Sequence, residues 1–129
     1  MRFCVAAIIR KGNKILLVHE RRDKPYEKCK GLLSLPAGKV EKGESLEEAV
    51  KREVKEETGL SVISSRFVSA LFLTTESEDI LGLIFECKCK GKANEFCMWL
   101  PIEEVFKMKL RFGMKEAIES YLKFKLARS

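Results

Sequence analysis

The stretch GKVEKGESLEEAVKREVKEETGL, residues 38–60, carries the most specific signals in this chain of 129 residues. Its second half predicts a helix over 45–58. Ser45 and Glu48 match the S-x-x-E capping box, in which each side chain bonds the backbone of the other residue in the first turn. Gly59 is the expected stop, because glycine readily adopts the left-handed conformation that ends many helices.

Carboxylates occupy a helix face where apolar side chains are expected. At roughly 100° per residue, the first half of the helix has an apolar stripe, formed by Leu46, Ala49 and Val50. Glu53 and Glu57 project from the same stripe, and Glu56 lies beside it. Three carboxylates near a buried face cost on the order of several kcal/mol to desolvate unless a cation neutralises them. All-oxygen clusters of high charge suit Mg²⁺ or Mn²⁺.

The alternative interpretation of these acids is a solvated, glutamate-rich helix surface. It fits Glu47 and Glu48, because each precedes a basic residue, Lys51 or Arg52, by four positions in the favourable order. Helix geometry alone leaves both readings open for Glu53, Glu56 and Glu57, and it favours the metal site.

The same stretch matches a longer pattern, G-x5-E-x7-R-E-U-x-E-E-x-G-U, in which U is a bulky aliphatic residue. All nine specified positions agree, over 23 residues: Gly38, Glu44, Arg52, Glu53, Val54, Glu56, Glu57, Gly59 and Leu60. The chain therefore resembles the Nudix hydrolases. The resemblance implies a single domain over 1–129 with an α/β/α sandwich around a mixed β-sheet. It also implies a hydrolase that uses Mg²⁺ or Mn²⁺ to cleave a diphosphate linked to a nucleoside.

Carried over position by position, the resemblance assigns the metal ligands and a general base. Glu53, Glu56 and Glu57 would ligate the metal, with the backbone carbonyl of Gly38 as a further ligand. Glu53 is also the first candidate for the general base. Alternatively, Glu53 only ligates metal and the base lies elsewhere, with Glu95 as the best candidate from another loop. The alternative for Glu95 is an ordinary surface glutamate.

Two further motif residues are interpreted as structural supports. Arg52 lies four residues after Glu48 and four before Glu56, so its guanidinium can orient the catalytic cluster by bidentate hydrogen bonds. Glu44 lies just before the helix, where the helix dipole favours an acid, and in the family pattern it braces the loop.

Basic side chains near the motif are candidates for substrate binding. Arg21, Arg22 and Lys39 could hold substrate phosphates, although solvated loop charges are an equal alternative for Arg22. Three phenylalanines at strand spacing are interpreted as core rather than as a platform for a nucleobase: Phe72, Phe85 and Phe96.

Markers downstream of the motif bear on the substrate. Relatives resembling ADP-ribose pyrophosphatases often carry a proline about fifteen positions after the last motif glycine, where this chain has Thr74. Relatives that cleave dinucleoside polyphosphates often carry a tyrosine nearby, and none occurs between Gly59 and Gly91. We therefore expect a MutT-like enzyme acting on nucleoside di- or triphosphates, including oxidised ones. The alternatives are an ADP-ribose or other nucleoside-diphosphate-X pyrophosphatase, or a non-catalytic nucleotide-binding module, which would usually lack motif carboxylates.

Composition and charge agree with a small-molecule enzyme. The net charge is +6, but residues 38–60 hold seven acids and five bases, so the rest of the chain carries +8. A basic body around an acidic site suits an anionic nucleotide, whereas no nucleic-acid-binding motif is present. The longest uncharged apolar stretch, 3–9, is far shorter than the roughly 18 residues of a membrane span. We expect no membrane segment, no signal peptide and a cytoplasmic protein, either monomer or homodimer.

The remaining side chains exclude other chemistries. Five cysteines without disulfide spacing favour reduced thiols. His19 is the only histidine, which argues against a Ser-His-Asp or Cys-His mechanism.

Periodicity and turn residues predict the order of elements. Strands are expected over 3–9, 14–19, 32–35, 67–74, 80–88 and 96–100. Residues 36–38 are expected to turn the chain into a loop, and 21–31 to form another. Helical structure is expected over 102–108, starting with Pro101 at its first position, and over 113–127. This order favours an α/β or α+β fold with a mixed sheet.

Overall fold

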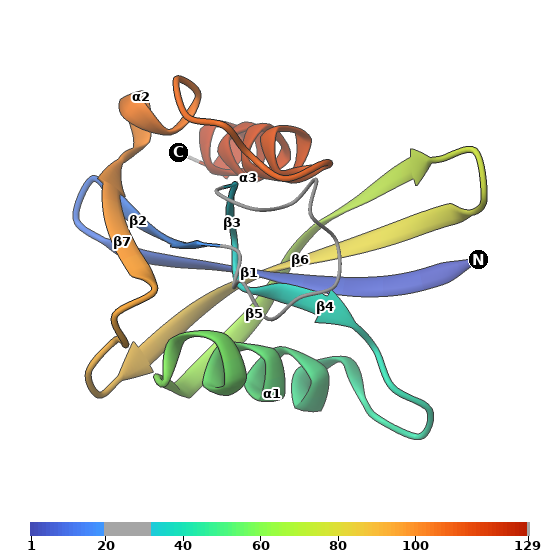
Figure 1. Cartoon of the computed structure of the whole chain (residues 1–129), viewed down its shortest axis with the longest axis horizontal. Helices are drawn as coiled ribbons and strands as arrows, with labels where there is room; N and C mark the ends of the chain where they lie inside the picture. The colour runs from blue at the N-terminus through green and yellow to red at the C-terminus, as the bar shows by residue number, and fades with distance from the viewer. Residues whose placement is uncertain (20–31, 129) are drawn as a thin grey trace.

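A mixed β-sheet forms the centre of the molecule, and helices lie on both sides of it (Figure 1). The computed structural model describes residues 1–19 and 32–128, so the expected loop at 21–31 lies outside the described residues. The strands in the described part are β1 (Arg2–Lys11), β2 (Lys14–His19), β3 (Leu33–Ser34), β4 (Ala37–Lys39), β5 (Ser61–Thr74), β6 (Asp79–Lys90) and β7 (Cys97–Pro101). The helices are α1 (Leu46–Thr58), α2 (Ile102–Val105) and α3 (Met114–Arg128). The predicted fold class is confirmed.

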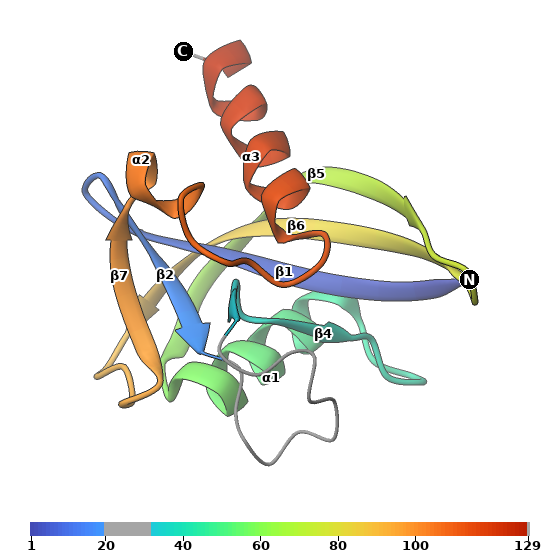
Figure 2. The same cartoon turned by 45° about the horizontal axis from the view of Figure 1, so that its top comes forward.

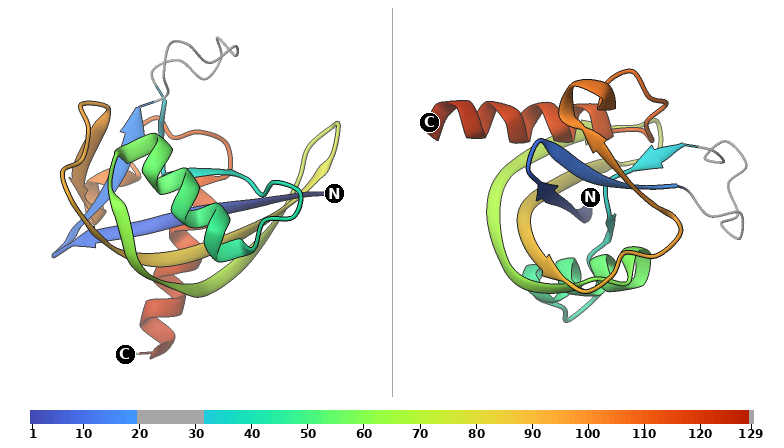
Figure 3. Two further views of the ribbon diagram at one scale, coloured as in Figure 1. Left: turned by 90° about the horizontal axis from the view of Figure 1, so that it is seen from below. Right: turned by 90° about the vertical axis from the view of Figure 1, so that its left-hand side faces the viewer.

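Strand β1 is the centre of the sheet. The strand order is β3-β2-β1-β6-β5, with β4 also paired to β1 and β7 to β2. β1 runs parallel to β6, and the other pairings are antiparallel. In Figure 2, β1 passes between α1 below and α3 above. Figure 3 shows that β5 and β6 curve strongly around the remaining strands. Since β1 has neighbours on both edges and helices over both faces, it is the most enclosed element.

The side chains of β1 alternate between two hydrophobic clusters, because successive residues of a strand point to opposite faces. The cluster towards α1 contains Val5, Ala7 and Ile9 of β1 with Ala49, Val50 and Val54 of the helix. The cluster towards α3 contains Ala6 and Ile8 with Ala117, Ile118 and Tyr121. A strand covered on both faces needs an unbroken apolar run, which explains the sequence VAAII.

The helix α1 begins and ends where the sequence predicts. The Ser45 hydroxyl accepts a hydrogen bond from the Glu48 amide, and the Ser45 amide donates to the Glu48 carboxylate, both at 3.1 Å. Gly59 ends the helix in the left-handed region, at φ 81°. Between these caps, Val50 and Val54 are buried, and full burial of a valine is worth about 1.5–3 kcal/mol. The caps and the apolar stripe together set where Glu53 lies on the sheet.

The segment after Pro36 differs from the sequence-based expectation. Residues 37–39, expected as a turn and loop, form β4, whose residues Ala37, Gly38 and Lys39 lie opposite Ala6, Val5 and Cys4 of β1. Only the C-terminal end of β1 pairs with β2, from Arg10 onwards. The N-terminal half of β1 therefore has an edge on which β4 can pair, and this long-range pairing outweighs the local preference for a turn. β4 fixes Gly38 on the sheet.

Two further boundaries differ from expectation. β5 begins at Ser61 rather than Phe67, because its ladder with β6 continues to the Ser61–Lys90 pair through serine-rich sequence that lacks strand alternation. α2 ends at Val105 rather than 108, and Pro101 is its N-cap residue rather than its first helical residue.

The three phenylalanines expected in the core are not equivalent. Phe85 is 2% exposed and packs edge-on against Phe67, with ring centroids 5.7 Å apart. Phe72 and Phe96 are 56% and 37% exposed, so the core interpretation is wrong for both. Phe72 lies on the edge strand close to the β5–β6 turn, and Phe96 lies in the turn before β7. Strand spacing alone does not distinguish these positions from a central one.

In the described residues, Cys4, Cys87 and Cys89 are free thiols, whereas Cys29 lies outside that part of the chain. No helix in the described residues is long and apolar enough to cross a membrane.

The capping box generates a stability prediction. Ser45→Ala removes the side chain that satisfies the Glu48 amide, so we expect it to lower the free energy of unfolding by about 1 kcal/mol. Urea denaturation would measure the change, with Ser64→Ala on the exposed part of β5 as the matched control. Equal effects of the two substitutions would contradict a specific role for the cap.

Candidate functional site

The Glu53 carboxylate lies at the base of the candidate site, between α1 and β4. Glu53 is only 9% exposed. Its carboxylate rests directly on Gly38, so that a methyl group added at Gly38 would overlap it. Any larger residue at position 38 would therefore displace the Glu53 carboxylate. The Gly38 backbone and the Glu53 side chain form one surface that bears oxygen atoms from two elements far apart in sequence.

Arg52 connects this surface to the loop before the helix. Its Nε and Nη2 donate to the two Glu44 carboxylate oxygens at 2.7 and 2.9 Å, a bidentate pair. Nη2 also donates to the Lys39 carbonyl at 2.9 Å. Nη1 donates to Glu53 Oε1 at 2.7 Å and reaches Glu56 Oε2 at 3.5 Å. One planar guanidinium thus fixes β4, the loop and the buried carboxylate relative to one another.

The structure refines the expected partners of Arg52. The bidentate pairing is with Glu44, whereas the Glu48 carboxylate accepts from the Ser45 amide in the capping box. Glu44 also accepts from the Glu41 amide at 3.0 Å. These contacts match the supporting geometry expected of Arg52 and Glu44.

The contact between Glu44 and Arg52 shifts the pKa of both side chains. Hydrogen bonds from Arg52, with a further one from the Glu41 amide, lower the pKa of Glu44 from 4.5 to about 2. The same contact with Glu44 raises the pKa of Arg52, and the contact with Glu53 adds to it. Glu44 therefore stays ionised well below the usual pKa of a glutamate, and Arg52 stays protonated throughout the neutral range.

The other two candidate ligands follow Glu53 on α1 and are more accessible. The Glu56 side chain is 57% exposed, and Glu57 is half-buried. Within residues 1–19 and 32–128, no three His, Cys, Asp or Glu side chains are positioned as a ready metal cluster. Glu53 and Glu56 instead converge on the Nη1 atom of Arg52.

The donor types nevertheless suit a hard divalent cation. The carboxylates of Glu53, Glu56 and Glu57 with a backbone carbonyl at Gly38 would form an all-oxygen set. The absence of a side chain at Gly38 leaves its backbone accessible to the same surface as Glu53. Because Glu56 is exposed, its side chain can change rotamer without disturbing the core.

Glu95 lies in an exposed turn between β6 and β7. Its neighbour Asn94 fixes this turn to the end of α1: the Asn94 side-chain amide donates to the Glu57 carbonyl at 2.9 Å, and its backbone amide donates to the Thr58 carbonyl at 2.8 Å. The structure thus brings the Glu95 turn to the helix that carries the acids. The sequence showed no signal for Asn94, because its partners are 37 residues away.

Of the three candidate phosphate-binding residues, the structure describes Lys39 alone. Lys39 is exposed at the end of β4, directly after Gly38. Arg21 and Arg22 lie outside the described residues.

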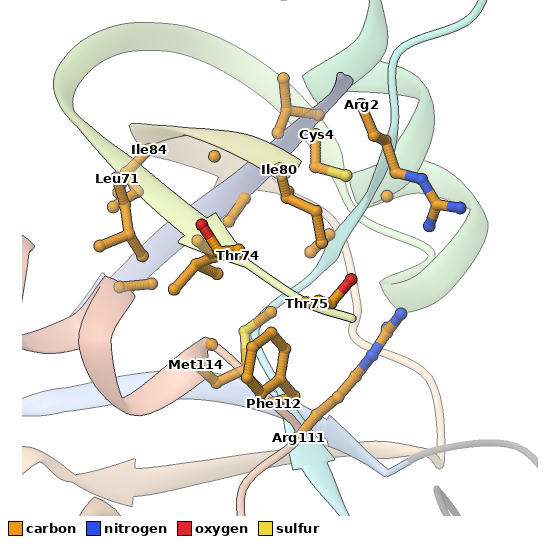
Figure 4. A pocket seen from close by; sticks show the side chains of 18 of the residues that line it. Arg2, Cys4, Leu71, Thr74, Thr75, Ile80, Ile84, Arg111, Phe112 and Met114 are labelled. Atoms are coloured by element: carbon orange, nitrogen blue, oxygen red, sulfur yellow. The ribbon is translucent and has the colours of Figure 1, made fainter. Parts of the chain in front are cut away.

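A cavity of about 840 Å³ adjoins the site and was not foreseen from the sequence. Its walls come from β1, β4, β5, β6 and the segment before α3, and include Arg2, Cys4, Gly38, Thr74, Arg111 and Phe112 (Figure 4). Gly38 lines the cavity and also contacts Glu53, so the cavity and the carboxylate surface share β4 as a wall. A volume of this size holds a nucleotide-sized molecule.

Comparison with known proteins identifies relatives over nearly the whole chain. The family model described as the NUDIX domain matches residues 1–121. A Methanocaldococcus jannaschii protein named ADP-ribose pyrophosphatase is 57% identical over 56 residues, which is 43% of this chain and 31% of that protein. A Caenorhabditis elegans protein named putative nudix hydrolase 1 is 45% identical over 93 residues, which is 69% of this chain and 24% of that protein. The chain thus spans less than a third of either relative.

Solved structures share the fold over similar lengths. The Escherichia coli ORF135 protein superposes with a TM-score of 0.82 at 26% identity, covering 99% of this chain and 93% of that one. The MutT NUDIX hydrolase from Burkholderia pseudomallei gives a TM-score of 0.78 at 22% identity, covering 92% and 96% of the two chains.

The brace formed by Glu44 and Arg52 predicts a pH-dependent stability. Because the pKa of Glu44 is lower in the folded state, its contribution is present above pH 4.5 and disappears as the pH falls towards about 2. Glu44→Gln should therefore be less stable than the wild type at pH 7, with the difference narrowing below pH 4.5. Urea unfolding across a pH series would measure this, with the exposed Glu47→Gln as control. A difference that is independent of pH would refute the prediction.

Proposed function

Because this chain belongs to the NUDIX family, we propose that it is a metal-dependent pyrophosphohydrolase that cleaves a diphosphate bond in a nucleoside di- or triphosphate. The observation that carries the proposal is the buried Glu53 carboxylate on Gly38, held there by Arg52. A purely structural protein would have no use for an acid placed between a helix and a sheet at this desolvation cost. The proposed substrate is a MutT-like one, including oxidised nucleotides.

Members of the family generally use divalent metals, and the residues present fit that use. We assign Glu53, Glu56, Glu57 and the Gly38 carbonyl as the atoms that would hold Mg²⁺ or Mn²⁺. A bound cation would neutralise the diphosphate charge and activate water for attack at phosphorus. The chain's own contribution is to fix the acids, which the Arg52 contacts to Glu44 and Lys39 accomplish.

Glu53 is our first candidate for the general base, and Glu95 is the alternative. Glu53 is held by Arg52 from one side only, through Oε1. Its second oxygen belongs to the same carboxylate surface and can take a proton from an attacking water. Glu95 would act from the turn that Asn94 fixes to the end of α1. Arg52 is a positioning residue, because its contacts are to protein groups.

The nucleotide would extend from this surface into the cavity that shares the β4 wall. Lys39 is proposed to contact its phosphates, and Arg21 and Arg22 remain proposed phosphate contacts as well. The partner is thus a small-molecule nucleotide, with neither nucleic acid nor membrane involved. We propose that the protein acts in the cytoplasm as a monomer or homodimer.

A second candidate function is ADP-ribose hydrolysis. It is favoured by the Methanocaldococcus jannaschii relative, whose name states that activity and whose identity to this chain is 57% over 56 residues. A non-catalytic binding module has less support, because this chain retains every motif carboxylate.

An activity assay with matched variants tests the proposed function. The panel contains canonical and 8-oxo nucleoside di- and triphosphates, ADP-ribose and a dinucleoside tetraphosphate, each with Mg²⁺ or Mn²⁺. We expect pyrophosphate release from a triphosphate, and Glu53→Gln to lower kcat by about 10²–10⁴-fold because it removes the proton acceptor. Glu47→Gln on the outer face of α1 should retain activity.

Two other results would change the assignment. Release of AMP from ADP-ribose alone would replace the first candidate with the second. Absence of turnover across the panel, with nucleotide binding intact, would refute the hydrolase and support a binding module.

A further inference from the structure

The cavity beside Gly38 has a polar side and an aromatic side that come from consecutive residues, Arg111 and Phe112. Both belong to the short connection that leads into α3. In Figure 4, the Phe112 ring lies inside the cavity, whereas the Arg111 side chain extends towards the side on which Arg2 and the green ribbon of α1 lie. Neither residue belongs to the motif that defines the family.

The backbone of this connection is fixed on the sheet. The Arg111 amide donates to the Leu33 carbonyl, and the Leu33 amide donates to the Lys109 carbonyl, both at 2.9 Å. The Met114 amide closes the turn by donating to the Arg111 carbonyl at 3.0 Å. Arg111 and Phe112 are thus presented by rigid backbone, which reduces the entropic cost of holding a ligand.

Gly113 allows the connection to approach β5 closely. Its φ of 84° lies in the left-handed region, and a methyl group there would come within 2.7 Å of Leu73 Cδ1. A side chain at this position would strain the backbone and would require Leu73 to move. Glycine therefore lets the residue after Phe112 pack closely against β5.

The two arginines of the cavity have different environments. Arg2 forms an ion pair with Glu78 at 2.8 Å, and Glu78 is itself fixed by hydrogen bonds to Thr75. Arg111 comes from the connection before α3, and Cys4 of β1 lines the same cavity. Burial raises the pKa of the Cys4 thiol, whereas the charges of Arg2 and Arg111 lower it.

Phe112 is a large apolar side chain that remains 60% exposed while it lines the cavity, which is open to solvent on one side. An aromatic ring in that position offers a face on which a planar group can stack. A guanidinium one residue away can bind a phosphate at the same time.

We propose that Arg111 and Phe112 form a clamp that determines substrate specificity, in which Arg111 binds a phosphate oxygen and Phe112 stacks on the nucleobase. The clamp selects substrates whose diphosphate is attached to a planar aromatic base over those with a sugar or an inorganic group alone. This inference rests on the proposed function, because it supplies the nucleoside-binding part of the same site.

Binding without catalysis tests the clamp separately from the hydrolase. The probes are the four nucleoside 5′-monophosphates and ribose 5-phosphate, titrated calorimetrically into the whole protein in EDTA. We expect at least one nucleotide to bind at least 10-fold more tightly than ribose 5-phosphate. Phe112→Ala should abolish that difference, since base stacking on an aromatic ring is worth about 5- to 150-fold in affinity. Arg111→Gln should weaken both types of probe by about 10-fold or more.

Matched controls come from the same region of the chain. Lys115→Ala removes an exposed cation of α3, and Phe106→Ala removes a half-exposed ring outside the cavity lining. Both should bind every probe like the wild type. Arg111→Lys keeps the charge without the planar fork and should recover part of the lost affinity, and thermal melting of each variant would establish that it is folded.

The outcomes separate the clamp from the proposed reaction. If the wild type binds no nucleotide, or if Arg111→Gln and Phe112→Ala bind all probes like the wild type, the clamp is refuted even when hydrolysis is observed. If the two variants lose binding as expected but the wild type hydrolyses nothing, the clamp holds and the proposed function fails. With an active enzyme, Arg111→Gln should raise KM by at least 10-fold and leave kcat within about 3-fold.

Discussion

The hydrogen bonds of the Arg52 guanidinium are the constraint on which the site depends. Glu44 supplies a bidentate partner, the Lys39 carbonyl a third acceptor and Glu53 a fourth, all within 2.9 Å. Without the arginine, the buried Glu53 carboxylate would lose its cationic partner, and Glu44 would lose its bond to the helix. Removing one partner from such a buried charged network is costly, because the remaining charges lose their compensation.

The hydrophobic core makes this polar network possible. β1 contributes side chains to both clusters, so α1 and α3 are attached to opposite faces of the same strand. β4 pairs with the half of β1 that β2 does not reach, and this pairing brings Gly38 under α1. The carboxylates therefore lie against the centre of the fold. The cavity shares β1 and β4 with them, and its other walls come from the β5–β6 hairpin and the connection before α3.

The parts of the structure that could be predicted from sequence are those specified by local signals. The ends of α1 follow from Ser45, Glu48 and Gly59, each of which acts within a few residues of its partner. The motif likewise located the acids on the helix, and its resemblance to a family implied the sandwich fold.

The unpredicted parts depend on contacts between distant segments. β4, the extension of β5 to Ser61 and the contact from Asn94 to α1 all use partners at least 20 residues away. The exposure of Phe72 depends on its place at the sheet edge, which periodicity does not reveal. The cavity combines short pieces of five segments, so no single stretch of sequence marks it.

The pairing of β1 with β4 limits how far the backbone at Gly38 can move. The backbone at Ala7 donates to the Pro36 carbonyl and that at Val40 donates to the Phe3 carbonyl, which extends the β1–β4 ladder on both sides of Gly38. The middle of this ladder is buried, at Val5, Ala6 and Ala37. We therefore expect its amide protons to exchange with solvent more slowly than those of the exposed loop that follows β4. Substrate entry and product release would then depend on side chains and outer connections more than on movement of β4.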